Sequence, residues 1–444
     1  MAEVTIYQIL DARDKRVQKQ KSILEKYKCP IVSFTMNIAG PEKISPLIER
    51  GFFRGIKALR EALGTDCILY ESIDTDITGC EAMFAVKMDV LKLKSICTHI
   101  EEESTLGRLF DMDVLDIDGN KLERKSVRGC IVCGAPGREC AARRLHSVKQ
   151  LQETTNKIFT DYFRNFDKNL ICRLAQKSLL DEVHTTPKPG LVDSRNSGSH
   201  KDMDINTFVK SADALKSYFG ECFHLGVETS GSLPKDTFSV INKIGIEAEH
   251  LMYSVTNRVN THKGMIYSMG ILCAAIGRLW RPEKPFASID EICIEGAKIA
   301  KDAVEKDFKN NDLTTAGRRA FKNIGITGIR GEVLSGFASV TKLALPSYRE
   351  LINKSLDPNF AGVITLLNLI AQVKDTNLYN RGGVEGSEYA VNKAKELLGQ
   401  SQLPTKEQIE ALDDEFIARN LSPGGCADLL AITYFLYNIE NYEF

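Results

Sequence analysis

Two aspartates separated by one residue could hold a metal ion. Asp111 and Asp113 alternate with Phe110, Met112 and Val114. If this segment is a β-strand, both carboxylates project from the same face, about 7 Å apart at Cα, and that spacing suits one shared Mg²⁺. Many nucleotidyltransferases hold in this way the metal that withdraws charge from a triphosphate. The alternative is a strand whose polar face is only solvated.

The segment that follows is strongly basic. Residues 121–149 contain eight Lys and Arg against two Glu, although the formal net charge of the whole chain is −1. Arginine binds phosphate oxygens through paired hydrogen bonds, so we expect a small phosphorylated ligand here. The expected binding residues are Arg108, Arg124, Arg128 and Arg143. Nucleic acid is not expected as a partner, because the segment has no aromatic side chain on which bases could stack.

Four candidate zinc ligands lie within the same basic segment. Cys130, Cys133, Cys140 and His146 fall within 17 residues, and three thiolates with one imidazole are a complete tetrahedral set for Zn²⁺. The alternative is a group of reduced structural thiols. The other cysteines of the twelve are scattered, which in a cytosolic protein predicts reduced thiols rather than a disulfide framework.

In the second half of the chain, polar residues concentrate in six short segments between expected helices. They are 186–193, 200–204, 256–264, 328–332, 375–383 and 422–428. Several open or close a helix, where free backbone N–H groups can bind phosphate, so we expect one anion-binding site. Taken singly, each could be ordinary turn and capping chemistry. The Walker and Rossmann glycine patterns are absent, so neither common nucleotide-binding loop is expected.

Residues of these six segments have distinct expected roles. Binding of the anion is expected from Lys188, Lys263, Arg330 and Arg381, and from Asn260, His262, Asn377, Gly424 and Gly425. The expected Mg²⁺ ligands are Asp202, Asp204, Asp375 and Asp428. A hydroxyl nucleophile also needs a base, for which the candidates are His200, Asp204 and Glu332. Asp204 could instead only cap the helix that begins beside it.

Residues 1–165 are expected to form an α+β domain that positions the aspartate pair. Strands are predicted at Cys29–Ile38, Cys67–Ile73, Ala82–Met88 and Leu106–Leu115, and a hairpin turn at 118–120 leads into a further strand at Lys121–Val127. Hydrophobic residues at helical spacing predict a helix within Pro41–Leu63. Strands and helices do not alternate regularly, so we expect a small mixed or mostly antiparallel sheet with helices to one side.

Residues 166–444 are expected to form an all-α domain. Amphipathic periodicity predicts helices at Lys168–His184, Asp204–Phe219, Lys235–Ser254, His262–Trp280, Ile289–Phe308, Phe360–Val373, Glu388–Leu398, Thr405–Asn420 and Ala427–Asn438. The domain boundary is expected between about 155 and 170, in a polar linker around Arg164–Asp167.

The composition is that of a soluble protein, with 43% hydrophobic residues and balanced charge. The longest uncharged apolar run, Gly264–Gly277, is shorter than the roughly 20 residues that a membrane helix needs. The first residues carry an acid where a secretory signal would be basic, and no apolar stretch follows. We therefore expect a cytoplasmic protein without a membrane partner.

Taken together, the motifs resemble two enzyme families joined in one chain. Thr35–Pro41, Gly107–Val114 and the cysteine array with Arg143 and His146 resemble holo-citrate lyase synthase, also called apo-citrate lyase phosphoribosyl-dephospho-CoA transferase. The second half resembles triphosphoribosyl-dephospho-CoA synthase. The matching segments there are Pro187–Asp193, His200–Asp204, Asn260–Gly264, Arg330–Glu332 and Ser422–Leu430. Cys426 departs from the family, which usually has a small residue such as Ser there.

The resemblance implies two consecutive Mg²⁺-dependent reactions. The all-α domain would join ATP to the ribose 2′-hydroxyl of 3′-dephospho-CoA and release adenine. The α+β domain would then transfer the phosphoribosyl-dephospho-CoA to a serine of the citrate lyase acyl carrier subunit and release pyrophosphate, with nucleotidyltransferase-like chemistry. Three alternatives stay open: the carrier of malonate decarboxylase as acceptor, a metal-dependent nucleotidyltransferase fused to an unrelated helical hydrolase, and a zinc-bearing adaptor that is not an enzyme.

Overall fold

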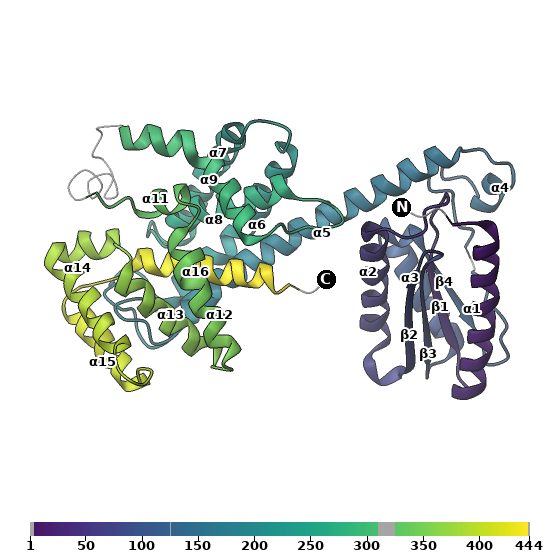
Figure 1. Ribbon diagram of the computed structural model, residues 1–444, viewed down its shortest axis with the longest axis horizontal. Coiled ribbons are helices and arrows are strands. Elements are labelled where there is room, and N and C mark those ends of the chain that lie inside the picture. Colours follow the sequence, from purple (N-terminus) through teal and green to yellow (C-terminus); the bar gives the residue numbers. More distant parts are fainter. Residues whose placement is uncertain (1–3, 125, 310–324, 443–444) are drawn as a thin grey trace. The chain divides into compact units, whose positions relative to one another are not determined.

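The computed structural model describes residues 4–124, 126–309 and 325–442. Contacts between Cα atoms divide the chain into two compact units, and the change from the first to the second falls between Phe166 and Asp167. The short segment Pro282–Lys284 belongs to the first unit. Figure 1 shows a sheet with helices in the first unit and helices in the second.

The first unit contains a four-stranded antiparallel sheet in the order β2-β3-β1-β4. Its strands are β1 (Ile31–Met36), β2 (Ile68–Asp76), β3 (Gly79–Val86) and β4 (Phe110–Leu115). Four of the five expected strands are therefore present, and no pair is parallel. The fifth, at 121–127, is wrong, because after one bridge between Leu115 and Lys121 the chain leaves the sheet.

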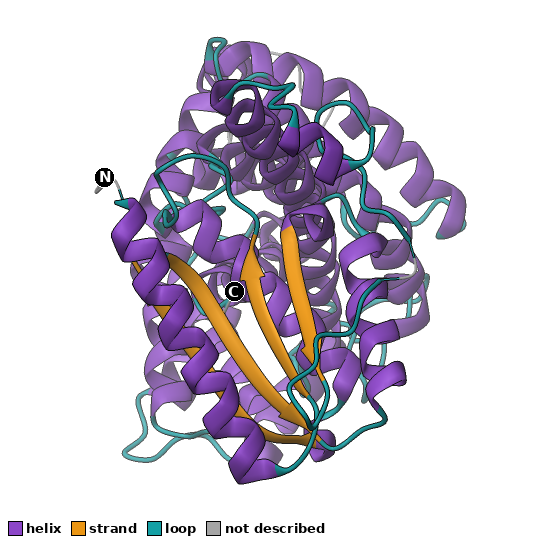
Figure 2. Ribbon diagram, turned by 90° about the vertical axis from the view of Figure 1, so that its right-hand side faces the viewer, coloured by secondary structure: helices purple, strands orange, loops and turns teal. Residues whose placement is uncertain are grey.

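Alternate residues of the strands face different helices. Ile31 and Leu115 lie in a cluster with Ile23 and Leu24 of α1 (Ile6–Tyr27), which covers one face. On the other face, the Phe34 ring stacks on Phe52 of α2 (Pro46–Leu63), with ring centroids 4.8 Å apart. Helix α3 (Val90–Glu103) packs along β4, the edge strand. Figure 2 shows a helix in front of the left part of the sheet, running roughly along the strands.

A single helix spans the boundary between the units. Helix α5 (Val148–His184) is continuous over 37 residues, so the polar linker expected around residues 164–167 is wrong. The polar residues there belong to one turn of a helix that also carries the buried Phe163. Asp167 is fully buried and accepts a hydrogen bond of 2.8 Å from Nε1 of Trp280, which explains a charged residue at this point.

The regular elements of the second unit are all helices within its described residues. Beside α5, its described α-helices are α6 (Ile205–Glu228), α7 (Pro234–Val255), α8 (Lys263–Leu279), α9 (Ile289–Lys309), α11 (Gly328–Leu334), α12 (Leu345–Asn353), α13 (Pro358–Gln372), α14 (Thr376–Leu398), α15 (Lys406–Ala418) and α16 (Gly424–Glu440), and the π-helix η3 (Val340–Ala344) precedes α12. Helices α8, α13 and α16 are mostly buried and form its core. Among the described residues, no helix combines the length and apolar character needed to cross a membrane.

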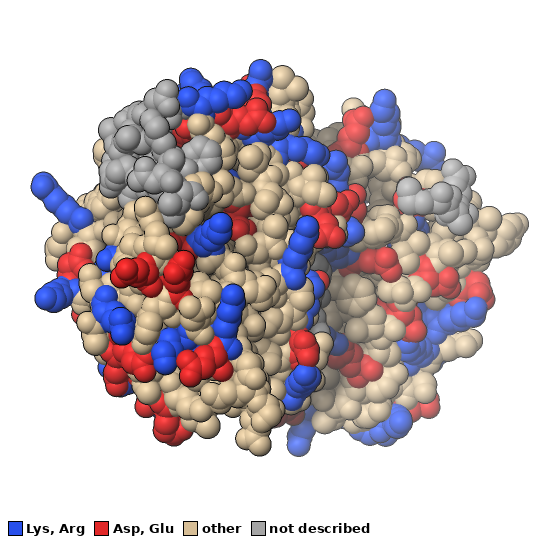
Figure 3. Space-filling model, turned by 60° about the vertical axis from the view of Figure 1, so that its left-hand side comes forward, with Lys and Arg blue, Asp and Glu red and all other residues tan. Residues whose placement is uncertain are grey.

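Acidic and basic side chains are interspersed on the face drawn in Figure 3, as expected for a chain of formal net charge −1. A surface of this kind gives no long-range field of one sign, so binding of an anionic ligand must depend on local arrangements of charge. Two cavities, one in each unit, provide such arrangements.

Candidate functional site

The aspartate pair of the first unit lies on strand β4, as the alternation predicted. Asp111 and Asp113 stand opposite Thr35 and Ser33 of β1, while Phe110, Met112 and Val114 are buried. Both carboxylates line a cavity of about 1140 Å³. Partial desolvation there and repulsion from Asp113 raise the pKa of Asp111. A pair of carboxylates that repel each other in this way is suited to hold a divalent cation.

Basic side chains line the same cavity as the aspartate pair. Nζ of Lys121 lies 2.6 Å from Oδ1 of Asp113. The other basic residues that line the cavity are Lys94, Arg108, Arg124, Arg128, Arg138 and Arg144. Arg143, expected among the phosphate ligands, does not line it, because at the end of the short helix α4 (Gly137–Ala142) its neighbour Arg144 lines the cavity instead.

Three of the four expected phosphate-binding arginines are engaged within the protein. Arg108 donates to the backbone carbonyl of Gly129 at 2.6 Å. The guanidinium of Arg128 donates to the backbone carbonyls of Gly107, Arg108 and Phe110 at 2.6–2.9 Å. Arg124 pairs with Glu101 and Glu102 at 3.3 and 3.0 Å. These contacts make the three arginines part of the cavity wall. Arg144 and Arg138 lie on the exposed segment beyond, where Arg138 pairs with the exposed Glu123 at 3.3 Å, and are the cations most available to a ligand.

A buried glutamate that the sequence analysis missed orders this wall. Glu101 of α3 is 3% exposed, accepts a hydrogen bond of 2.9 Å from the backbone N–H of Met112, and faces Arg124 and Arg128. Burial raises its pKa, against the effect of both arginines. Helix α3 was not predicted, so the sequence analysis did not place Glu101 beside β4.

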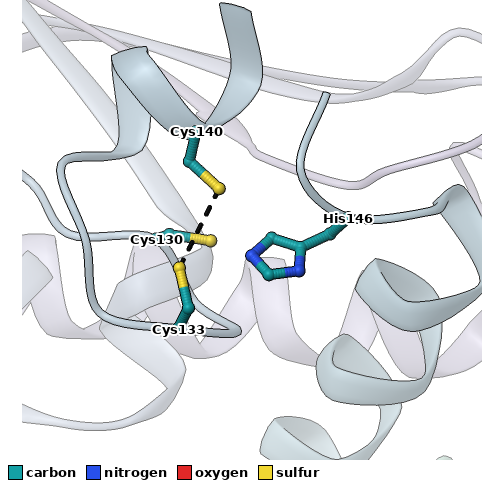
Figure 4. A group of neighbouring side chains, drawn as sticks. All are labelled: Cys130, Cys133, Cys140 and His146. Atoms are coloured by element: carbon teal, nitrogen blue, oxygen red, sulfur yellow. Dashed lines mark hydrogen bonds between the residues drawn. The ribbon is translucent and has the colours of Figure 1, made fainter. Parts of the chain in front are cut away.

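The predicted zinc ligands come together in the first unit. Cys130, Cys133, Cys140 and His146 each offer a ligand atom, and these atoms lie within 4.8 Å of one another. Figure 4 shows the imidazole pointing toward the three sulfurs. All twelve cysteines of the chain are free, so no disulfide competes for these thiols.

In the second unit, most of the predicted residues line one cavity of about 600 Å³. It collects Lys188, His200, Asp202, Asn260, His262, Lys263, Glu332, Asp375, Asn377, Arg381, Gly424, Gly425 and Asp428 from all six polar segments. Helices α8, α14 and α16 begin at Lys263, Thr376 and Gly424, which also line it. Three helix N-termini therefore open onto one cavity, which favours a strongly anionic ligand.

Two of the expected residues lie elsewhere. Asp204 does not line the cavity. It is exposed and forms a capping box with Thr207 at the start of α6, and hydrogen bonds from Thr207 lower its pKa. Arg330 is also outside the lining, because its guanidinium pairs with Asp307 at 2.8 Å. The placement of Asp204 favours a role in capping over a role as base or metal ligand.

Lys188 is buried and paired. It is 1% exposed, and its Nζ donates to the carbonyl oxygen of Glu182 at 2.7 Å and to Oε1 of the same residue at 2.5 Å. Burial raises the pKa of Glu182, against the effect of the ammonium. The sequence analysis missed Glu182, which lies inside a helix without any motif.

His200 is held between two partners and is not free to act as the base. The guanidinium of Arg381 donates to Nδ1 of His200 at 3.1 Å, so the ring proton lies on Nε2, which faces the hydroxyl of Ser422 at 2.9 Å. Burial and the nearby guanidinium lower the pKa of His200. Arg381 also donates to the carbonyl oxygen of Ser199, so these contacts tie the segment around residue 200 to α14 and α16.

His262 presents an unpartnered ring nitrogen in the wall of the cavity. It is 3% exposed, and burial lowers its pKa to about 3, so the ring is neutral at neutral pH. The Ser211 hydroxyl accepts from Thr261 at 2.8 Å and lies 2.7 Å from Nδ1 of His262, so its own proton is available to Nδ1. The ring hydrogen then lies on Nε2, which is buried and has no hydrogen-bond partner among the described residues.

The carboxylates of this cavity differ in how far the protein occupies them. Asp375 accepts three backbone N–H groups, and Glu332 accepts from the amide and hydroxyl of Ser339. Asp428, half-buried on α16, accepts no hydrogen bond from any residue that the structure describes. Desolvation and the carboxylates of Glu182 and Asp375 raise its pKa well above the ordinary value. Asp428 and the exposed Asp202, which likewise accepts no hydrogen bond from a described residue, are thus the acids of the cavity most available to a ligand.

Comparisons with known proteins assign both units to transferase families. The family model for ATP:dephospho-CoA triphosphoribosyl transferase matches residues 168–443, and the model for apo-citrate lyase phosphoribosyl-dephospho-CoA transferase matches residues 4–162. The chain belongs to both families and is a transferase of two fused units.

Relatives with both parts are known. The chain is 34% identical to "Protein CitXG" of Haemophilus influenzae, with 99% of this chain and 97% of that protein covered. The protein of the same name from Leuconostoc mesenteroides is 32% identical, over 98% and 97%. The "Probable 2-(5''-triphosphoribosyl)-3'-dephosphocoenzyme-A synthase" of Citrobacter koseri is 41% identical, covering 60% of this chain and 89% of that protein.

Proposed function

We propose that the chain makes and attaches the prosthetic group of citrate lyase in two steps. The second unit joins the triphosphoribosyl part of ATP to 3′-dephospho-CoA, and the first unit transfers the product to the acyl carrier subunit. The observation that carries the proposal is the cavity of the second unit, where three helix N-termini meet an unpartnered carboxylate. The helix N-termini can bind a triphosphate, and the carboxylate can accept the proton of a hydroxyl nucleophile.

In the second unit, the ribose 2′-oxygen of dephospho-CoA attacks the anomeric carbon of ATP. The bond from that carbon to N9 of adenine breaks, and adenine leaves with the electron pair and gains a proton. The proton of the attacking hydroxyl passes to Asp428, because burial and the neighbouring carboxylates of Glu182 and Asp375 raise its pKa and so make it a stronger base than an ordinary aspartate. His262 donates its Nε2 hydrogen to the bound nucleotide as a neutral group.

Mg²⁺ is the metal in this proposal. In the second unit, Asp375 is occupied by backbone N–H groups and Glu182 by Lys188. Asp202 accepts no hydrogen bond from a described residue and the carboxylate of Glu332 accepts only from Ser339, so these two carboxylates would hold Mg²⁺ with the triphosphate. In the first unit, Asp111 and Asp113 would hold it. When bound, the ion neutralises phosphate charge. Zinc, the other metal expected from the sequence, has no chemical step in this scheme.

In the first unit, the reaction is a phosphoryl transfer of the nucleotidyltransferase type. The carrier serine oxygen attacks the phosphorus nearest the ribose, the bond from that phosphorus to the oxygen bridging to the next phosphate breaks, and pyrophosphate leaves while the serine proton passes to solvent. Arg138 and Arg144 are the cations placed to bind the departing pyrophosphate, because Arg124 and Arg128 are engaged in the wall.

The test is to incubate the full chain with ATP, Mg²⁺ and 3′-dephospho-CoA and to measure free adenine. The proposal expects one adenine for each dephospho-CoA consumed, and no ADP or AMP. Release of ADP or AMP would contradict it and favour a nucleotidyltransferase or hydrolase. Addition of the apo-carriers of citrate lyase and malonate decarboxylase, in separate reactions, then identifies the acceptor by its gain in mass.

A further inference from the structure

The segment from Gly129 to His146 has almost no hydrophobic core of its own. Cys140 is its only buried residue, and apolar side chains such as Val132 and Leu145 are exposed. Its regular structure is limited to the six-residue helix α4. Burial of apolar surface is the usual source of order in a folded segment, so another interaction must hold this one.

The Cys–His group, Cys130, Cys133, Cys140 and His146, has the dimensions of a tetrahedral metal site. The Sγ atoms of Cys133 and Cys140 are 3.9 Å apart, far beyond the ~2.05 Å of a disulfide bond. Two sulfurs at about 2.3 Å from one zinc ion, at a tetrahedral angle, lie about 3.8 Å apart. Figure 4 shows that the sulfurs come from one turn and from α4, and that the imidazole closes the remaining side.

The imidazole gives an independent sign of a missing ligand. Nε2 of His146 is buried and has no hydrogen-bond partner among the described residues. A buried polar atom without a partner costs about 1–3 kcal/mol. Reduced thiols in the group would leave this cost uncompensated, since none of them hydrogen-bonds Nε2. A metal ion coordinated by Nε2 removes it.

The turn that carries the first two cysteines is built to hold thiolates. The backbone N–H of Val132 points at Sγ of Cys130 at 3.4 Å, and a donor aimed at sulfur stabilises its negative charge. Gly134 follows at φ 76°, a conformation that suits glycine, and its N–H donates to the carbonyl oxygen of Cys130 at 2.9 Å. Both sulfurs are therefore presented by a closed turn.

The metal-binding segment is tied to the strand that carries the aspartate pair. Arg108 donates to the carbonyl oxygen of Gly129 at 2.6 Å, and Arg128 donates to that of Phe110 at 2.6 Å. The N–H of Gly137 donates to the carbonyl oxygen of Arg128 at 2.9 Å. Cys130, Cys140 and His146 line the same cavity as the aspartates, so a change in the segment reshapes that cavity.

We propose that the Cys–His group binds one structural zinc ion, and that this ion holds residues 129–146 as a wall of the cavity in the first unit. Four protein ligands leave no open position on a tetrahedral ion, which marks a structural rather than a catalytic site. The ion fixes Arg138 and Arg144 where they can meet a phosphorylated ligand. This last consequence rests on the function proposed for the first unit, whereas the binding of zinc does not.

Zinc content tests the binding directly. The full chain, purified without chelator, is expected to carry one zinc per chain by elemental analysis, and Cys133→Ser or His146→Ala less than a tenth of that. The control is Cys67→Ser, which changes a half-buried thiol of the same unit outside the group, and this variant should keep its zinc.

Co²⁺ in place of zinc in the unmodified chain should give the visible absorption of tetrahedral cobalt with thiolate charge transfer. Zinc well below one per chain after incubation with equimolar Zn²⁺, or octahedral cobalt spectra, would overturn the proposal.

The structural role has a separate readout. Chelation of zinc from the unmodified chain should open the segment 129–146 to protease and reduce carrier modification at least tenfold, while adenine release by the second unit stays within twofold. Re-addition of Zn²⁺ should restore both properties. If the zinc-free chain resists protease at this segment and modifies the carrier at the normal rate, the role in the cavity wall is wrong. If the zinc-loaded chain also fails to modify any carrier, the function proposed for the first unit is at fault, and the metal content still decides the site.

Discussion

Asp375 accepts a hydrogen bond of 2.8 Å from the backbone N–H of Cys426. Its other carboxylate oxygen accepts from the N–H groups of Asn377 and Leu378, so one buried side chain links the starts of α14 and α16. These are two of the three helix N-termini that open onto the cavity of the second unit.

Replacement of Asp375 by Asn should therefore separate the two helix starts. The amide places an NH₂ group against a backbone N–H, and the loss of one buried hydrogen bond should lower the free energy of unfolding by about 1–3 kcal/mol. Adenine release should fall as well. Trp280, the only tryptophan of the chain, lies in the second unit and reports its urea unfolding by fluorescence. The control is Asp357→Asn at the exposed cap of α13, where Asn caps as well as Asp and neither property should change.

Asp428 and Asp204 should differ sharply when each is replaced. Asp428→Asn removes the unpartnered acid of the cavity and should lower adenine release by about 10²–10⁴-fold with stability unchanged or improved, because it relieves repulsion from neighbouring carboxylates. Asp204→Ala should cost about 1 kcal/mol of stability and little activity. Asp204→Asn keeps the cap, so a large loss of turnover in this variant would show that Asp204 acts in the active site.

Gly264 should not tolerate a side chain. A Cβ at this position would lie 2.0 Å from Oδ2 of Asp428, so in Gly264→Ala the carboxylate must move. Because that group is the end of a side chain, the variant should fold normally and release adenine at least tenfold more slowly. Gly231→Ala is the matched control, since a Cβ there meets no atom within 4 Å. Equal rates in the two variants would show that the position of Asp428 is unimportant.

His262 should make the second unit sensitive to acid. Its pKa is about 3 in the folded chain and about 6.5 when unfolded, so below pH 6.5 the unfolded chain binds a proton that the folded chain does not. Stability should therefore fall with decreasing pH between about 6.5 and 3, by about 2 kcal/mol on going from pH 7.5 to 5. Urea unfolding followed at Trp280 measures this loss. His262→Gln should lose this part of the pH dependence, and an unchanged slope would contradict it.

Elements whose hydrophobic residues repeat regularly could be predicted from the sequence, whereas contacts between distant residues could not. Strand β4 and its aspartate pair follow from the alternation around Met112, and the long helices of the second unit follow from their apolar spacing. Helix α1 was missed because it is largely polar and buries only Ile23 and Leu24. The linker expected near residues 164–167 was wrong, because a polar turn of a continuous helix resembles a linker in the sequence.

Within the sites, the residue types were predictable but not their engagement. Arginine is a residue type that commonly binds phosphate, yet the guanidinium of Arg128 donates to three backbone carbonyls. Lys188 is paired with Glu182, and His200 lies between Arg381 and Ser422. Some of these partners lie far away in the sequence, and Glu182 lies inside a helix where no motif marks it. The spacing of neighbouring residues therefore does not predict these contacts.

The central claim is that two units of one chain catalyse consecutive reactions, and the double variant Asp111→Asn with Asp113→Asn tests it most directly. The substitutions remove the two carboxylates of the aspartate pair, and they change no residue of the second unit. With ATP, Mg²⁺, 3′-dephospho-CoA and the apo-carrier of citrate lyase present, adenine and carrier mass are followed in the same reaction. The account predicts that adenine is released at the unmodified rate while triphosphoribosyl-dephospho-CoA accumulates and the carrier gains no mass. Loss of both reactions in a folded chain, or normal modification of the carrier, would contradict it.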